Sequence, residues 1–219
     1  MSRLTALALT SALLVVALPA GSAPAGRSPK PVCGPAHAKT LVQGRRARVY
    51  VVGTRLERAD GGAYGYACLA RTRGRVLLEG VGCLGSSSGC RTLGPVAVAG
   101  RFVAYASQTY GGAYGDEHFA LVVLDLRTRK VRYETHEGIP AEVQAGISDV
   151  VIRPTGAAAW LWTRGGTPVV SRTPGCGPTT LAEGDDINPA ALWRNGRRVF
   201  WRQAGQDRSA ALCGRGQRP

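Results

Sequence analysis

Four segments of this chain share one pattern, in which a glycine and a short lead-in precede a run of strand-forming residues. The glycines are Gly44, Gly100, Gly156 and Gly196, so they are 56, 56 and 40 residues apart. The first segment reads GRRARVYVV at residues 44–52, and the third reads GAAAWLW at residues 156–162. Such a period is typical of stacked β-sheet modules. It constrains the architecture strongly and does not by itself indicate a function.

The intervals between these glycines divide into short strand patterns separated by turn residues. The expected strands are residues 38–43, 48–56, 64–72 and 75–81; 95–99, 101–110, 117–128 and 130–136; 147–153, 157–163, 167–173 and 179–183; and 189–194, 197–203 and 208–214. No helical period occurs beyond the N-terminal segment. Several strands are apolar at consecutive positions, as in FALVVL at residues 119–124, which predicts sheets that are covered on both faces.

These patterns predict an all-β fold, namely a β-propeller-like repeat of about four blades over residues 38–219. A two-sheet β-sandwich is the alternative, although it would show more alternation of apolar and polar residues. The fourth module lacks an outer strand. In a closed ring, residues 28–33 are a candidate to complete it as an edge strand, and an open, partial propeller remains the other possibility.

Three stretches resemble turns of the WD40-like β-propeller repeats found in exported bacterial proteins. Residues 122–131 (VVLDLRTRKV) look like a turn between third and fourth strands. Residues 152–160 (IRPTGAAAW) and 192–200 (LWRNGRRVF) are similar to turns between first and second strands. The resemblance implies a propeller and no specific activity, because propellers include scaffolds, binding proteins and enzymes.

Residues 1–25 have the features of a secretory signal peptide. Arg3 supplies the positive charge, residues 4–18 are apolar, and Ala23-Pro24-Ala25 offers a small-residue cleavage site. The apolar run is shorter than the roughly 20 residues that a membrane helix needs, so we expect cleavage and no transmembrane segment in the mature protein. A retained signal anchor is the alternative. Residues 26–37 then form an extended N-terminal arm, and the protein is expected to be secreted or extracytoplasmic.

Propeller connectivity sorts the charged turns onto two faces. The turns between second and third strands, and the connections between modules, form what we call the acidic face. The other turns of each module form the basic face, which receives Arg45, Arg46, Arg71, Arg73, Arg101, Arg127, Arg129, Lys130, Arg172, Arg197 and Arg198. Turns are also charged for solubility alone, and a net charge of +14 is a weak indication of a polyanionic partner. The sorting nevertheless predicts that Arg45, Arg46, Arg197 and Arg198 contact an anionic cell-surface polymer or lipid headgroups.

The acidic face carries the candidate residues for a specific ligand. The string GGAYG occurs at residues 61–65 and 111–115, so Tyr64 and Tyr114 lie at equivalent hairpin tips, where they can stack on a sugar or peptide. Duplication of a shared turn also explains the string and is the preferred interpretation. Candidate polar ligand-binding residues nearby are Asp116, Glu117, His118, Asp185 and Asp186. Because no calcium-loop spacing is present, no metal site is predicted.

All six cysteines, Cys33, Cys68, Cys83, Cys90, Cys176 and Cys213, follow the signal peptide. An even number of cysteines in an exported chain predicts three disulfides. The face of each turn predicts the pairs Cys33–Cys68, Cys83–Cys90 and Cys176–Cys213. The first pair is expected towards the acidic face and the third on the basic face.

No catalytic residue is predicted. GSSSG at residues 85–89 satisfies the G-x-S-x-G pattern of hydrolases, but that pattern requires a preceding strand and a following helix. The expected function is therefore a secreted, non-enzymatic binding protein of the cell envelope or extracellular space. Its partner is an anionic surface polymer or a protein or carbohydrate ligand, without nucleic acid or a cofactor. The alternatives are a propeller hydrolase or lyase that acts on envelope carbohydrate, and a purely structural surface protein.

Overall fold

The computed structural model describes residues 32–53, 63–72, 74–81, 90–110, 117–139 and 146–213. The signal peptide and the other remaining residues lie outside this description. The described chain is all-β, as expected. Its strands are β1 (Lys39–Gln43), β2 (Ala47–Val52), β3 (Ala63–Leu69), β4 (Arg75–Val81), β5 (Cys90–Ala99), β6 (Phe102–Tyr110), β7 (Glu117–Asp125), β8 (Lys130–Ile139), β9 (Gly146–Ile152), β10 (Ala158–Arg164), β11 (Thr167–Arg172), β12 (Thr180–Glu183), β13 (Ile187–Asn195), β14 (Arg198–Gln203) and β15 (Gln206–Ala211).

The strands pair in chain order and form four antiparallel units. The first unit is β1–β4, the second β5–β8, the third β9–β12 and the fourth β13–β15. A parallel bridge between Gly80 and Thr92 joins β4 to β5, so the first two units form one eight-stranded sheet. Each of the fifteen expected strands is present. The largest difference at a strand start is β5, which begins at Cys90 instead of Pro95 because pairing with β6 continues across an irregularity between Leu93 and Val96.

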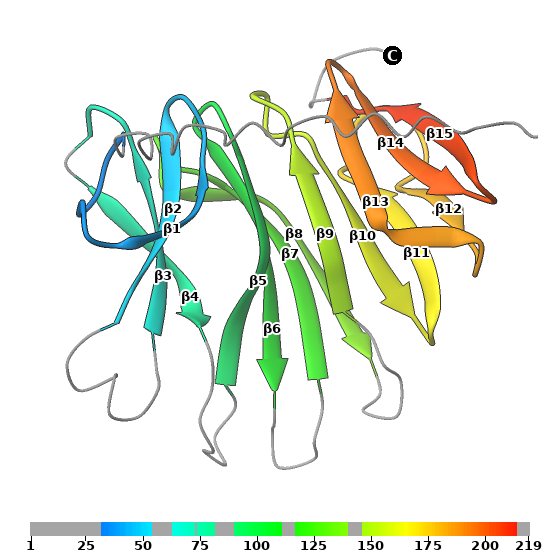
Figure 1. Ribbon diagram of the computed structural model, residues 1–219, viewed down its shortest axis with the longest axis horizontal. Coiled ribbons are helices and arrows are strands. Elements are labelled where there is room, and N and C mark those ends of the chain that lie inside the picture. The colour runs from blue at the N-terminus through cyan, green and yellow to red at the C-terminus, as the bar shows by residue number, and fades with distance from the viewer. Residues whose placement is uncertain are drawn as a thin grey trace, which may run out of the picture.

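The four units lie in a row, with the first and the fourth at opposite ends of the molecule (Figure 1). Consecutive residues of the inner strands enter different cores. On β7, Val122 and Leu124 pack against the first unit, whereas Leu121 and Val123 pack against the third. This two-sided burial explains why the strand is apolar at consecutive positions.

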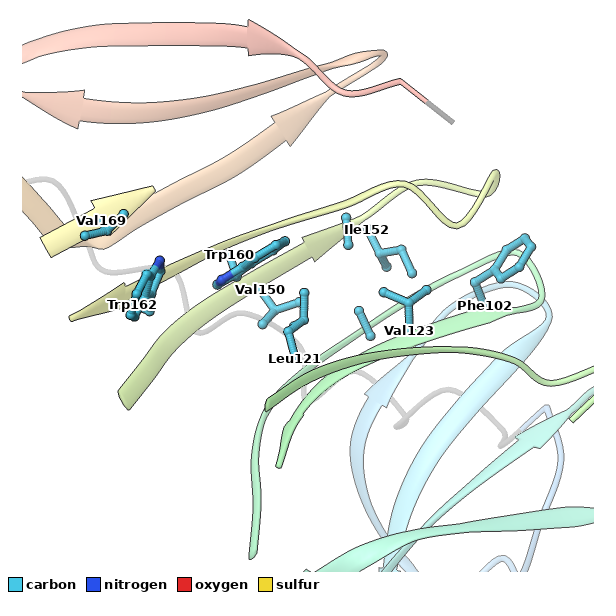
Figure 2. Packing of buried hydrophobic residues seen from close by; sticks show 10 residues of the cluster. Phe102, Leu121, Val123, Val150, Ile152, Trp160, Trp162 and Val169 are labelled. Carbon is cyan, nitrogen blue, oxygen red and sulfur yellow. The ribbon is translucent and has the colours of Figure 1, made fainter. Parts of the chain in front are cut away.

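Figure 2 shows the core between the second and third units. Phe102, Leu121 and Val123 of the second unit face Val150, Ile152, Trp160, Trp162 and Val169 of the third. The indole N–H of Trp162 donates to the Ser171 hydroxyl at 3.0 Å, so this large side chain enters the core with its donor satisfied.

The outer face of the first unit is covered by residues 32–38. Cys33 and Ala38 pack there with Tyr50 and Cys68, and Tyr50 stacks on Tyr66. Val32 and Cys33 therefore belong to the first unit. Residues 28–33 were a candidate to complete the fourth unit, which lies at the other end of the row, so the candidate fails for these two residues, and residues 28–31 lie outside the description. On the outer face of the fourth unit, Trp193 stacks on Phe200 with the ring centroids 5.6 Å apart.

Candidate functional site

The basic face contains a cavity of about 500 Å³ where the turns of the first and second units meet. Its lining consists of five arginines and two apolar residues, namely Arg45, Arg46, Leu69, Ala70, Arg71, Arg101 and Arg127. They come from four turns: β1–β2, β3–β4, β5–β6 and β7–β8. We call this feature the arginine cavity. The turns β1–β2 and β5–β6 lie along the upper edge of Figure 1.

Short backbone hydrogen bonds hold the two turns of the first unit together. The amide of Gly44 donates to the carbonyl of Ala47 at 2.9 Å and closes the β1–β2 hairpin around Arg45 and Arg46. The amide of Ala70 donates to the carbonyl of Arg46 at 2.6 Å, so the β3–β4 turn is fixed against the β1–β2 turn. Main-chain hydrogen bonds thus fix the backbone that carries the arginines of both turns.

A buried carboxylate organises the second unit's side of the cavity. Asp125, which is 1% exposed, forms an ion pair with Arg101 at 3.1 Å and accepts a hydrogen bond from the amide of Arg127 at 3.0 Å. The amide of Leu126 donates to the carbonyl of Arg101 at 3.0 Å. One aspartate therefore ties the β5–β6 turn to the β7–β8 turn and neutralises one of the five guanidinium groups.

The other four guanidinium groups have no such partner. In the part of the chain that the structure describes, the side chains of Arg45, Arg46, Arg71 and Arg127 make no hydrogen bond or ion pair with another residue. They carry four positive charges around one cavity, and the nearby Asp125 is already engaged. The arrangement attracts anions, because converging like charges next to a low-dielectric wall raise the local concentration of counterions.

Arg197 and Arg198 lie at the turn between β13 and β14, far from the arginine cavity along the row. The Arg198 guanidinium donates to the Ser209 hydroxyl at 2.7 Å and to the Ser209 carbonyl at 3.2 Å. The pKa of the Arg153 guanidinium is lowered mainly by burial and further by the positive charges of Arg197 and Arg194. The four predicted arginines of the basic face are therefore divided between two sites.

Arg172, which was expected on the basic face, is buried instead. Its guanidinium donates to the carbonyls of Pro178 at 2.9 Å, of Cys176 and of Ala211, and burial lowers its pKa. It is a structural residue at the end of β11, where the chain turns towards β12, and it does not present its charge to solvent.

The structure does not bring the described acidic-face candidates together. Tyr64 is 38% exposed on β3 of the first unit, whereas Asp185 and Asp186 are exposed in the connection from β12 to β13. Asp186 accepts a hydrogen bond from the Gln203 amide at 3.0 Å. Tyr114, Asp116 and the side chains of Glu117 and His118 lie outside the description. Within the described ranges, no three histidine, cysteine or acidic side chains gather in a way that could hold a metal ion.

Two of the three predicted disulfides are confirmed. Cys33 is bonded to Cys68 with the Cα atoms 6.0 Å apart, and Cys176 is bonded to Cys213 with the Cα atoms 5.7 Å apart. The predicted Cys83–Cys90 pair lies outside the described residues. Disulfides are typical of an oxidising, extracytoplasmic environment.

The expected side of the first disulfide was wrong. In the sheet, Cys68 lies opposite Arg48 of β2 and Arg75 of β4. It is therefore near the end of β3, where the chain turns into β4 on the basic face. The reason is the length of β3, which carries the chain from the hairpin tip across the whole sheet before it reaches Cys68.

Nothing in the described part of the chain forms a helix long and apolar enough to span a bilayer. Sequence reasoning placed Arg71, Arg101 and Arg127 on the basic face but did not single them out, and it missed the role of Asp125. The arginine cavity is thus a candidate site that the structure reveals and that the sequence did not predict. Comparison of the chain with protein-family models, with curated proteins and with solved structures finds no match in any of the three.

Proposed function

We propose that this is an extracytoplasmic, non-enzymatic binding protein of the cell envelope or extracellular space, and that its basic face holds an anionic surface polymer. The observation that carries the proposal is the convergence of five arginines from four turns on one cavity, of which, among the described residues, only Arg101 is neutralised by a carboxylate. Guanidinium groups are suited to this task because their planar donor sets bind oxyanions in a defined geometry.

The proposal includes export and a propeller-like fold. The N-terminal signal pattern and the two disulfides support secretion. The stacking of four antiparallel units in a row supports an open, propeller-like array, in which all the first-to-second strand turns emerge on one face. A polymer that lies along this face would meet the arginine cavity first and the arginines of the fourth unit further along.

The experiment measures retention of the mature protein on three immobilised polymers: a polyol phosphate, polygalacturonate and neutral dextran. We expect retention on at least one polyanion and none on dextran. Retention should fall steeply between 50 and 500 mM salt, because exposed charges are screened over about 10 Å at 0.1 M.

A charge-matched pair of variants separates the site from net charge. Replacing Arg45, Arg46 and Arg127 with serine should abolish most retention. The control replaces three arginines near the second-to-third strand turns, Arg164, Arg202 and Arg208, and should retain most of it. Equal losses in the two triple variants would mean that only net charge matters, and the proposal would fail.

No observation among the described residues favours a carbohydrate-cleaving enzyme, so that alternative stays a prediction. The same holds for a specific ligand at Tyr64 and Tyr114.

A further inference from the structure

The charge balance of the arginine cavity limits the kind of anion that fits it. Five guanidinium groups line the cavity, and Asp125 neutralises Arg101. Four positive charges remain within one cavity of about 500 Å³. A singly charged group compensates one of them, whereas a phosphate monoester carries about 1.5 to 2 negative charges at pH 7.

The directions from which the arginines reach the cavity also favour a tetrahedral anion. Arg45 and Arg46 come from the β1–β2 turn, Arg71 from the β3–β4 turn and Arg127 from the β7–β8 turn. A carboxylate presents two oxygens in one plane and is matched by a single bidentate arginine. A phosphate monoester presents three terminal oxygens in three directions, so it can accept from guanidinium groups on several sides at once.

The cavity is larger than a bare anion requires. Its volume falls within the roughly 300–1,000 Å³ typical of sites for small organic ligands. Leu69 and Ala70 add an apolar part to the wall, against which the carbon skeleton of a ligand can rest. Resting on the proposed function, we infer that the arginine cavity binds a phosphate monoester on a sugar or polyol unit of the surface polymer.

Arg71 gives this inference a selective test. Its φ of 65° lies in the left-handed region, which glycine adopts more readily than a residue with a side chain. Replacing Arg71 with glycine therefore removes a cavity guanidinium and relieves the backbone at the same time. Loss of binding without loss of thermal stability is the signature of a ligand residue.

The second unit offers a matched control at the equivalent turn. Arg129 also has a left-handed backbone, with φ of 58°, but it does not line the cavity. Its guanidinium lies against Gly74, where an added Cβ would be 2.0 Å from Nη2. Arg129→Gly thus makes the same chemical change at the same kind of backbone position outside the proposed site.

The experiment titrates the mature protein at low salt with glucose 6-phosphate, glucose 6-sulfate, glucuronate and inorganic phosphate, followed by NMR or calorimetry. We expect glucose 6-phosphate to bind about tenfold more tightly than glucuronate, with the sulfate ester in between and inorganic phosphate weaker than the sugar phosphate. Arg71→Gly should weaken glucose 6-phosphate binding about tenfold with an unchanged or higher melting temperature. Arg129→Gly should change it less than twofold.

Three results would overturn the inference: equal affinity for glucuronate and glucose 6-phosphate, no effect of Arg71→Gly, or equal losses in both glycine variants. The proposed function is tested by a different measurement, namely retention on the immobilised polymers. Salt-dependent retention on a polyanion without a preference for the phosphate ester leaves the binding protein intact and removes the phosphoryl site. Absence of retention on every polyanion removes both.

Discussion

Among the residues that the structure describes, three arginines are buried and act as donors to the backbone. Arg48, Arg153 and Arg172 are 1%, 8% and 4% exposed. Arg153 donates to the carbonyl of Leu212, and Arg172 donates to that of Ala211, so both reach the end of the fourth unit. Burial of a charged group is tolerated only when hydrogen bonds replace its hydration. These guanidinium groups therefore hold loops in place.

Arg48 supports the loop that covers the first unit. Its guanidinium donates to the carbonyls of Cys33 at 3.1 Å, Pro35 at 2.9 Å and Ala38 at 2.6 Å, and to the Thr40 hydroxyl at 2.9 Å. We predict that Arg48→Met lowers the free energy of unfolding by about 3 kcal/mol, because several buried acceptors lose their donor at about 1–3 kcal/mol each, before any rehydration. Urea denaturation measures the change.

Arg75 provides the control for Arg48. It is exposed on β4 of the same unit, and its guanidinium carbon lies 4.4 Å from the centre of the Tyr66 ring. Arg75→Met should cost less than about 1 kcal/mol, as expected for an exposed cation–π contact. Similar losses in the two variants would contradict a special role for the hydrogen bonds of Arg48.

Asp149 makes the stability depend on pH. Burial raises the pKa of this β9 carboxyl, although the amides of Val150 and Leu192 partly offset the effect. Between the ordinary value of 3.8 and the raised value, the folded state holds more protons than the unfolded state, so stability falls as the pH rises through that window. We predict that Asp149→Asn is more stable than the wild type at pH 7 and that the difference shrinks below pH 3.8.

Urea midpoints at several pH values test this prediction. The asparagine oxygen can still accept from the amide of Val150, which donates to Asp149 at 2.7 Å, so the substitution mainly removes the charge. A constant difference between variant and wild type at every pH would show that titration of Asp149 is irrelevant.

At the scale of elements, the strands could be predicted from the sequence because burial of both faces makes consecutive residues of a strand apolar. Trp160 and Trp162 enter the core with the second unit, whereas the intervening Leu161 enters the core with the fourth. All three positions are therefore apolar, and glycines mark the turns on either side of such runs. At Gly156, φ of 85° and a Phe102 ring 3.1 Å from the place of a Cβ explain why glycine is needed.

The candidate site was only partly predictable from the same sequence. Strand order assigns Arg45, Arg71, Arg101 and Arg127 to one face, but their convergence depends on how the first two units stack. The printed sequence also does not distinguish the buried Arg172 from the exposed Arg198, because both lie where a strand meets a turn. Burial is decided by long-range packing, here against the end of β15.

At the scale of the whole molecule, each unit depends mainly on its neighbours in the row. The cores lie between the first and second, second and third, and third and fourth units. In such an array, stability is approximately a sum of unit and interface contributions, and the ends can open separately from the middle. The two described disulfides strengthen these two ends: Cys33–Cys68 fixes the covering loop of the first unit, and Cys176–Cys213 joins the third unit to the end of the fourth.

We therefore predict that loss of each disulfide opens a different end. Each pair is 35 or 37 residues apart, and the chain-entropy model assigns such a crosslink about 4 kcal/mol. In the Cys176→Ser/Cys213→Ser variant, hydrogen exchange of backbone amides should accelerate first in β13–β15, because this interface loses its crosslink while the core between the second and third units is unchanged. In the Cys33→Ser/Cys68→Ser variant, acceleration should begin in residues 32–43 and β2. Uniform acceleration throughout both variants would instead mean that the row unfolds as one cooperative unit, since global unfolding exposes every amide together.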